Sequence, residues 1–377
     1  MKKFFALTMA CAMLTGVLSG CGSTAVVHVS DADLLAADTG STTEETTMES
    51  TESTGTTETT TEEGETAEVT GAYPVKTGLA VQGSLTSSKP AADGEDGLAQ
   101  ADVNIVAVTV TDEGIIESCV IDAVQIKMNF DGAGSITSDL TAPVLSKVER
   151  GDDYGMAKAS SIGKEWYQQA QALADYVEGK TIAEVRTMAV DEATKPTDVD
   201  LASSVTISIG SYLDMIGMAY NNAVHLGAQS GDELSIAQET SIGDSTSATA
   251  DALGALSGTI NVSAVTTNGG VITSCVIDAI QPKVEFDTTG TITTDVTPPV
   301  ESKNFLGTDY GMSKASAIGK EWNEQAAAFA AYTVGKTADE VTGIAVSETG
   351  GAADADLAAS CSIAIGGFQS VVAKAAK

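Results

Sequence analysis

Apolar and polar residues alternate along residues 103–110, as they do in a strand with one buried face. Asp112, Glu113 and Gly114 follow as a hairpin turn, in which glycine supplies the positive φ. Residues 115–124 return as a second strand. A turn at 130–134 then leads to a short strand at 135–138. The pattern therefore predicts antiparallel strands.

The hydrophobic period changes after these strands. Residues 157–177 carry apolar side chains at spacings of three and four, which predicts an amphipathic helix ended by Gly179. Thr181, with Glu184 three residues later, predicts a second, short helix with a capping box. Residues 205–209 are either a strand or the entry to a last helix.

The apolar pattern occurs twice. Residues 114–210 align with residues 270–366 at a constant offset of 156 and without a gap. A period of this length indicates a duplicated domain rather than a solenoid repeat. We place the boundary in the polar stretch near 225–231, which gives repeat domains at 71–227 and 228–377. The predicted fold class is α+β, with two tandem copies of an antiparallel sheet and helices packed on one face of each.

The N-terminus has a different pattern. Residues 1–3 are a short basic start, and residues 4–18 are an apolar run too short for a comfortable membrane span. The run ends in Leu18-Ser19-Gly20-Cys21, which resembles the lipobox of bacterial lipoproteins. The resemblance implies that residues 1–20 are removed as a signal peptide and that Cys21 is lipidated. The protein would then be anchored to the cell membrane and face its extracytoplasmic side. The alternative is an ordinary signal peptide.

Residues 21–70 are predicted to form a disordered tether. Residues 41–66 are almost entirely Thr, Glu and Ser, without an aromatic residue. Such a segment buries too little apolar surface to offset its ordering entropy. Its eight glutamates repel one another and extend the chain.

Charge excludes several classes of partner. The 377 residues include 52 acidic and 19 basic side chains, for a net charge of −33. A nucleic-acid partner needs a basic face on the protein, so nucleic-acid binding is not expected. The same negative charge repels anionic lipid headgroups, which argues against adsorption to them. His28 and His225 are the only histidines, and neither lies in the aligned blocks. Their absence there removes Ser-His-Asp and Cys-His catalysis, and favours a redox carrier or a binding protein over a hydrolase.

Other reactive residue types admit simple structural interpretations. Cys119 and Cys275 occupy the same position in the two copies, and burial as small apolar side chains is favoured over a disulfide between the copies. Acidic pairs such as Asp198 and Asp200 match no calcium loop, and no metal site is expected. Trp166 is interpreted as a core residue, the alternative being that Trp166 or Tyr154 stacks on a planar ligand.

One segment suggests a cofactor. Residues 200–208 read Asp-Leu-Ala-Ser-Ser-Val-Thr-Ile-Ser, which resembles the flavin-attachment signature of bacterial FMN-binding domains. In that family a separate transferase joins FMN to the signature threonine through a phosphoester. The resemblance implies an acidic position at Asp200, a first hydroxyl at Ser203 and attachment at Thr206. Asp356 and Ser362 take the corresponding places in the second copy, and Ser204 and Ser360 stand where the family has glycine.

Two functions remain open at this point. The first is a membrane-anchored, extracytoplasmic FMN-binding-like protein that carries electrons to a redox partner at the cell envelope. The second is a non-enzymatic surface lipoprotein, with a binding or structural role, in which the duplicated module holds no cofactor. Tandem copies would then raise avidity through effective concentration.

Overall fold

The computed structural model describes residues 71–377, so the predicted signal peptide, Cys21 and tether lie outside the described residues. The strands are β1 (Pro74–Ser84), β2 (Gly97–Val110), β3 (Ile116–Phe130), β4 (Val224–Gln229), β5 (Glu233–Ser241), β6 (Gly254–Ser257), β7 (Thr259–Asn268), β8 (Val271–Ile280), β9 (Lys283–Phe286) and β10 (Val300–Glu301). The α-helices are α1 (Lys147–Arg150), α2 (Trp166–Val177), α3 (Ile182–Arg186), α4 (Val199–Ala202), α5 (Gly210–Asn221), α6 (Lys303–Leu306), α7 (Trp322–Thr333), α8 (Ala338–Thr342), α9 (Ala355–Ala358) and α10 (Gly366–Ala375).

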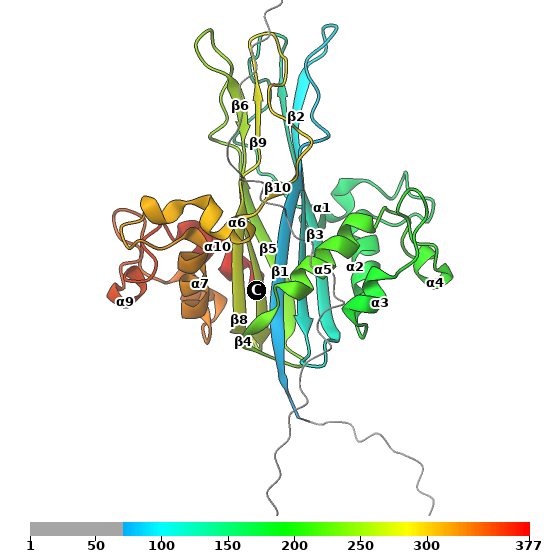
Figure 1. Cartoon of the computed structure of the whole chain (residues 1–377), viewed down its shortest axis with the longest axis vertical. Coiled ribbons are helices and arrows are strands. Elements are labelled where there is room, and N and C mark those ends of the chain that lie inside the picture. The colour runs from blue at the N-terminus through cyan, green and yellow to red at the C-terminus, as the bar shows by residue number, and fades with distance from the viewer. Residues whose placement is uncertain (1–70) are drawn as a thin grey trace, which may run out of the picture. The chain divides into compact units, whose positions relative to one another are not determined.

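The predicted α+β class with antiparallel sheets is confirmed (Figure 1). In the first half, β1 pairs with β2 and β2 pairs with β3, all antiparallel. In the second half, β5 pairs with β7 and β7 with β8, while β6 and β9 form a separate pair. The sheets of the two halves therefore differ in detail.

The difference arises from a broken hairpin. β2 and β3 run without interruption for 14 and 15 residues. At the corresponding place in the second half, Gly258 separates β6 from β7, and Pro282 lies between β8 and β9. Proline cannot donate to a β-ladder, so it interrupts strand pairing where Ile126 continues it in the first half. The Gly258 N–H donates to the Pro282 carbonyl at 3.0 Å and keeps the two segments in register.

A central apolar core lies between the strands of the two halves. It draws on both halves, with Val103, Ile105 and Ile126 from the first and Val262 and Val284 from the second. The rings of Phe130 and Phe286, equivalent residues of the two copies, stack with centroids 4.0 Å apart. All the described residues belong to one compact unit. The expected boundary at residue 227 falls inside β4, which pairs with β1.

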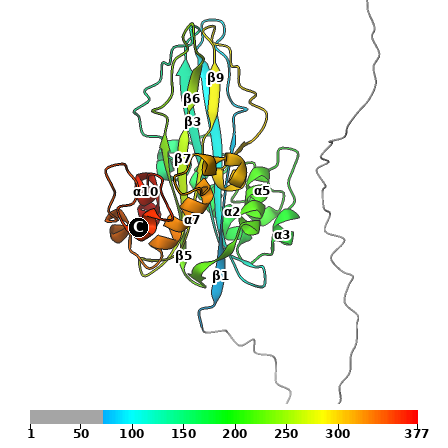
Figure 2. The same ribbon diagram turned by 60° about the vertical axis from the view of Figure 1, so that its left-hand side comes forward.

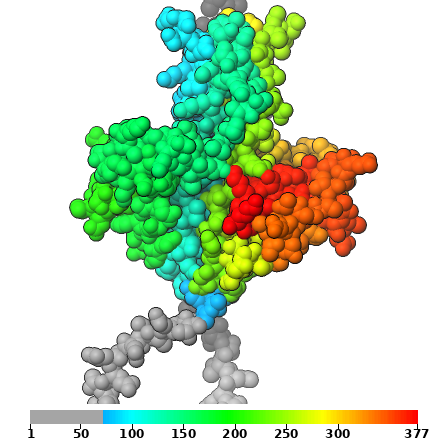
Figure 3. All heavy atoms as spheres, turned by 180° about the vertical axis from the view of Figure 1, so that it is seen from behind, coloured from blue at the N-terminus to red at the C-terminus, as the bar shows by residue number. Residues whose placement is uncertain are grey.

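Two further cores lie under the helices. α2 and α5 pack on the outer face of the first sheet through residues such as Trp166, Leu173 and Ile216. α7 and α10 cover the second sheet in the same way, with Trp322 and Phe329. The layers run helix, sheet, sheet, helix, as the views from front and behind agree (Figures 1 and 3). The strand ends that carry β6, β9 and part of β3 project beyond the helices (Figure 2).

Several element boundaries differ from the sequence prediction. The long helix begins at Trp166, so the prediction of helix over 157–165 is wrong. Gly163 has φ of +66° there, and Glu165 caps the helix through a capping box with Gln168. The predicted Thr181 cap is confirmed by the bond that its Oγ1 accepts from the Glu184 N–H at 3.3 Å.

The segment at 205–209 is neither strand nor helix, because α5 begins only at Gly210. The short strand expected at 135–138 is reduced to one bridge between Phe130 and Ile136. Within residues 71–377, no helix is both long enough and apolar enough to cross a membrane.

Candidate functional site

The predicted cofactor residues of the first copy lie between α2 and α5, around α4. Asp198 caps α4 by accepting hydrogen bonds from the N–H groups of Asp200 and Leu201. Ser203 Oγ donates to the Asp200 carbonyl at 2.7 Å. Asp200 and Ser203 are exposed, so their polar atoms shape and cap the helix at the surface.

A buried glutamine fixes the predicted attachment residue. Gln169 Oε1 accepts hydrogen bonds from the Thr206 N–H at 2.8 Å and from Thr206 Oγ1 at 3.2 Å. Gln169 Nε2 donates to the Lys164 carbonyl at 3.1 Å, so the amide joins two loops. Thr206 itself is half-buried.

The second copy repeats this arrangement. Gln325 Oε1 accepts from the Ser362 N–H at 2.9 Å and from Ser362 Oγ at 3.1 Å. Ser362 is exposed, and Ser360 Oγ donates to the Leu357 carbonyl at 3.2 Å, with the Asp356 carbonyl as a second acceptor at 3.3 Å. Sequence reasoning missed both glutamines. The signal was a glutamine identical in both copies on the apolar face of a helix.

Two of the residues that depart from the flavin signature lie in the core. Val205 and Cys361 are buried beneath the helices, and Ser204 is half-buried beside Val205. The surface nearby is acidic. Burial first, and then the Asp198 and Asp200 carboxylates, raise the pKa of the Tyr176 hydroxyl.

The tryptophans that occur at the same position of the two copies are core residues. Trp166 is only 3% exposed, and Lys147 Nζ lies 4.9 Å from its ring centroid and 5.2 Å from that of Tyr154. Lys303 lies in the same way between Trp322 and Tyr310. The lysine occupies the ring face that a planar ligand would need, so the core interpretation of Trp166 is confirmed.

Two grooves occur at equivalent positions of the halves. The first has a volume of about 290 Å³, and its lining includes Gln125, Lys127, Asp139, Pro143, Arg150 and Ile242. The second, of about 460 Å³, is lined by Gln281, Lys283, Asp295, Pro299, Lys303 and Leu85 among others. Leu85 belongs to the first half and Ile242 to the second. Each groove is thus built from both halves.

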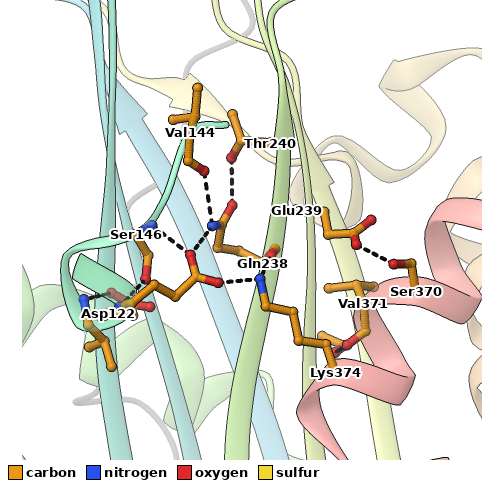
Figure 4. Close-up of polar contacts among 12 residues, drawn as sticks. Asp122, Val144, Ser146, Gln238, Glu239, Thr240, Ser370, Val371 and Lys374 are labelled. Carbon is orange, nitrogen blue, oxygen red and sulfur yellow. Dashed lines mark hydrogen bonds and ion pairs between the residues drawn. The ribbon is translucent and has the colours of Figure 1, made fainter. Parts of the chain in front are cut away.

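A polar network holds the wall of the first groove (Figure 4). Gln238 Nε2, on β5 of the second half, donates to the Val144 carbonyl at 3.4 Å and to Glu149 Oε2 at 2.5 Å. Lys374 on α10 forms an ion pair with Glu149 and donates to the Gln238 carbonyl. Although burial opposes it, the bonds from Lys374, Ser146 and Gln238 lower the pKa of Glu149, which stays ionised. Residues of the second half therefore hold in place the loop of the first half that contains Val144 and lines the groove.

The second groove has its wall fastened by strand pairing. β10 pairs with β1 through Gln82 and Glu301, and Gln82 Nε2 donates to Glu301 Oε1 at 3.1 Å. Inside the groove, Tyr310 Oη donates to Gln281 Oε1 at 3.1 Å. Tyr154 and Gln125 make the corresponding bond at 3.3 Å beside the first groove.

The cysteines give no reactive centre in this part of the chain. Cys119, Cys275 and Cys361 are buried free thiols, which confirms the burial interpretation over the disulfide. Burial raises the pKa of Cys275 to about 12 and that of Cys119 further, so neither thiolate forms near neutral pH. Residues 71–377 contain no group of three or more His, Cys, Asp or Glu arranged to hold a metal ion.

Comparisons with protein-family models, with curated proteins and with solved structures found no match for this chain.

Proposed function

We propose that this protein is a non-enzymatic binding protein with two equivalent grooves, held outside the cell membrane through Cys21 and its tether. The observation that carries the proposal is that each groove takes residues from both halves while keeping the same Gln, Lys, Asp and Pro positions. Two sites on one rigid unit favour a partner that presents the same group repeatedly, because the second contact is then intramolecular.

Both grooves hold cations that could contact an acidic partner, beside the carboxylates of Asp139 in the first and of Asp295 and Glu301 in the second. Lys127 and Arg150 line the first groove, and Lys283 and Lys303 line the second, in a chain with only 19 basic residues. Lys283 also pairs with Glu285 at 2.6 Å. Because the rest of the protein surface is negatively charged, an anionic group would be attracted only where these few cations lie. A repeating polymer of the envelope that carries carboxylate or phosphate groups fits this chemistry.

A glycan and polymer array, followed by titration calorimetry, tests this function. We expect binding to polyanionic envelope polymers, with a loss on the order of 100-fold when Lys127→Glu disables one groove, because avidity is removed. Lys283→Glu should act alike. Lys180→Glu is the matched control, since this lysine lies over Tyr176 and away from the grooves. Equal loss in the control, or no binding to any polyanion, refutes the proposal.

Flavin carriage is a second candidate. It is favoured by the half-buried Thr206 and the exposed Ser362, whose hydroxyls have matching surroundings in the two copies. FMN joined there would supply one- and two-electron chemistry, with the protein passing electrons to a redox partner at the envelope. Co-expression with a flavin transferase should then give a yellow protein with modified Thr206 peptides, lost in Thr206→Val. A colourless protein with unmodified peptides, even with added FMN, excludes this candidate.

A further inference from the structure

A third cavity lies beside the second half. It has a volume of about 490 Å³ and is lined by residues of β4, β8 and α7. Both β4 and α7 lie against β8 (Figure 1). Its walls include Val224 and Leu226 from β4, Ile277 from β8, Ala331 from α7, and Val334 at the C-cap of α7. None of its lining residues is charged, although the chain carries a net charge of −33.

The duplicated chain supplies its own comparison. Ala327, Ala331 and Val334 on the cavity side of the second copy correspond to Gln171, Asp175 and Glu178 in the first. Within residues 71–377, no strand pairs beside β3 as a counterpart of β4. The first copy shows that this surface of the helix can carry polar side chains. Apolar side chains replace them in the second copy, where β4 forms one wall of a cavity. Folding of the helix alone does not require the change, because α2 forms with the polar residues.

The linker strand contributes apolar side chains that remain accessible. Val224 is 54% exposed, Leu226 38% and Val334 37%. The intervening residue, His225, is directed to a different partner, because its Nε2 lies 2.9 Å from Asp112 Oδ1. Alternation along β4 thus presents two aliphatic side chains to the cavity.

One polar atom in the wall lacks a partner. Asn323 Oδ1 is buried and accepts no hydrogen bond. In the first copy this position is Tyr167, whose hydroxyl donates to Asp152 at 3.2 Å. A buried acceptor without a donor is costly, and a ligand hydroxyl or N–H would satisfy it.

We propose that this cavity binds an uncharged, largely apolar small molecule that carries a hydroxyl group. Aliphatic walls would bury the body of the ligand, and the Asn323 amide would hydrogen-bond to its hydroxyl. A charged ligand would lose hydration without gaining an ionic partner. This site is separate from the grooves and from the hydroxyls of Thr206 and Ser362.

The test uses the full chain and 2-naphthol as the probe, followed by fluorescence and by titration calorimetry. We expect saturable binding with one site per chain. 2-Naphthoate, with the same rings and a negative charge, should bind at least tenfold more weakly, and naphthalene, without the hydroxyl, several-fold more weakly.

The variants come from the chain itself. Ala331→Asp with Val334→Glu places the first-copy side chains in the cavity and should weaken 2-naphthol binding at least tenfold, with a thermal melt to confirm folding. Asn323→Tyr should also weaken it. Val199→Glu adds a carboxylate at an exposed position on α4 and should leave binding unchanged.

Three results would overturn the proposal. The first is the absence of saturable binding by the unaltered chain. The second is binding that is equally strong in the cavity variants and in Val199→Glu. The third is concentration-dependent dimerisation that the cavity variants abolish, which would make Val224, Leu226 and Val334 part of a contact between two copies of the chain.

Discussion

At the residue scale, two buried carboxyls have pKa values well above the ordinary value for aspartate. Asp122 and Asp278 are equivalent residues, and each accepts backbone hydrogen bonds that fasten a short helix to its strand, from Val148 at 3.2 Å and from Asn304 at 3.0 Å. Burial outweighs these bonds and raises the pKa of each carboxyl to about 6, from an ordinary value of 3.8. The folded protein therefore binds these two protons more tightly than the unfolded chain does, although both carboxyls are mostly ionised near neutral pH.

This shift predicts a pH dependence of stability. Because the pKa is higher in the folded than in the unfolded chain, stability is lost as pH rises from about 4 to above 6, by up to roughly 3 kcal/mol for each carboxyl. Asp122→Asn with Asp278→Asn keeps an acceptor oxygen and removes the titration. Urea unfolding at several pH values should show the variant gaining stability over the parent chain as pH rises.

Other carboxylates act in the opposite direction, and the comparison with the parent chain removes their contribution. Glu149, for instance, has a lowered pKa and loses stability on acidification. A constant difference between variant and parent from about pH 4 to 8 would contradict the assignment of the shift to Asp122 and Asp278.

Sequence alone located the hydroxyl residues of the candidate flavin site but could not describe their surroundings. Thr206 and Ser362 are identified by local order, whereas their bonds to Gln169 and Gln325 span 37 residues. A polar side chain on a buried helical face signals a partner without identifying it. The buried roles of Cys119 and Trp166, by contrast, follow from apolar periodicity and were predictable.

At the scale of elements, the sequence predicted where the strands of the first hairpin lie better than how long they are. β3 was expected to end at residue 124, yet Ile126, Met128 and Phe130 continue the alternation and are buried. Their burial depends on the second half, which no local pattern reveals. The helix boundary at Trp166 was missed because Gly163 and Glu165 impose a turn and a cap within an apolar period.

The Phe130–Phe286 stack should be a major contributor to hairpin packing. Phe130 is fully buried, and Phe130→Ala is expected to reduce the free energy of unfolding by about 3–5 kcal/mol. Phe305→Ala serves as the control, because this ring is 62% exposed and its removal should cost less than about 0.5 kcal/mol. Chemical denaturation compares the two. Similar losses of stability in both variants would show that the Phe130–Phe286 stack does not contribute more than an exposed ring does.

At the scale of the whole molecule, the central core is shared between the halves. Neither sheet has its inner face covered without the other, and β4 and β10 both pair with β1. The duplication was readable from the sequence. The contacts across it were not, because periodicity identifies the apolar face of a strand and not the surface on which that face packs.

The shared core predicts that a half does not fold independently. Residues 71–231 expressed alone should lack a sharp cooperative unfolding transition and should expose apolar surface to a dye such as ANS. Mixing with residues 232–377 should restore the transition and suppress dye binding. A monomeric half that unfolds cooperatively would contradict this expectation.

Covalent fusion of the copies also releases them from a constraint on homodimers. A change in one subunit of a symmetric dimer appears in both, so opposite sides cannot specialise separately. Here Pro282 alters one hairpin while Ile126 leaves the other intact, and Val334 differs from Glu178 in the same way. One side of the molecule can thus acquire a new property while its counterpart retains the original one.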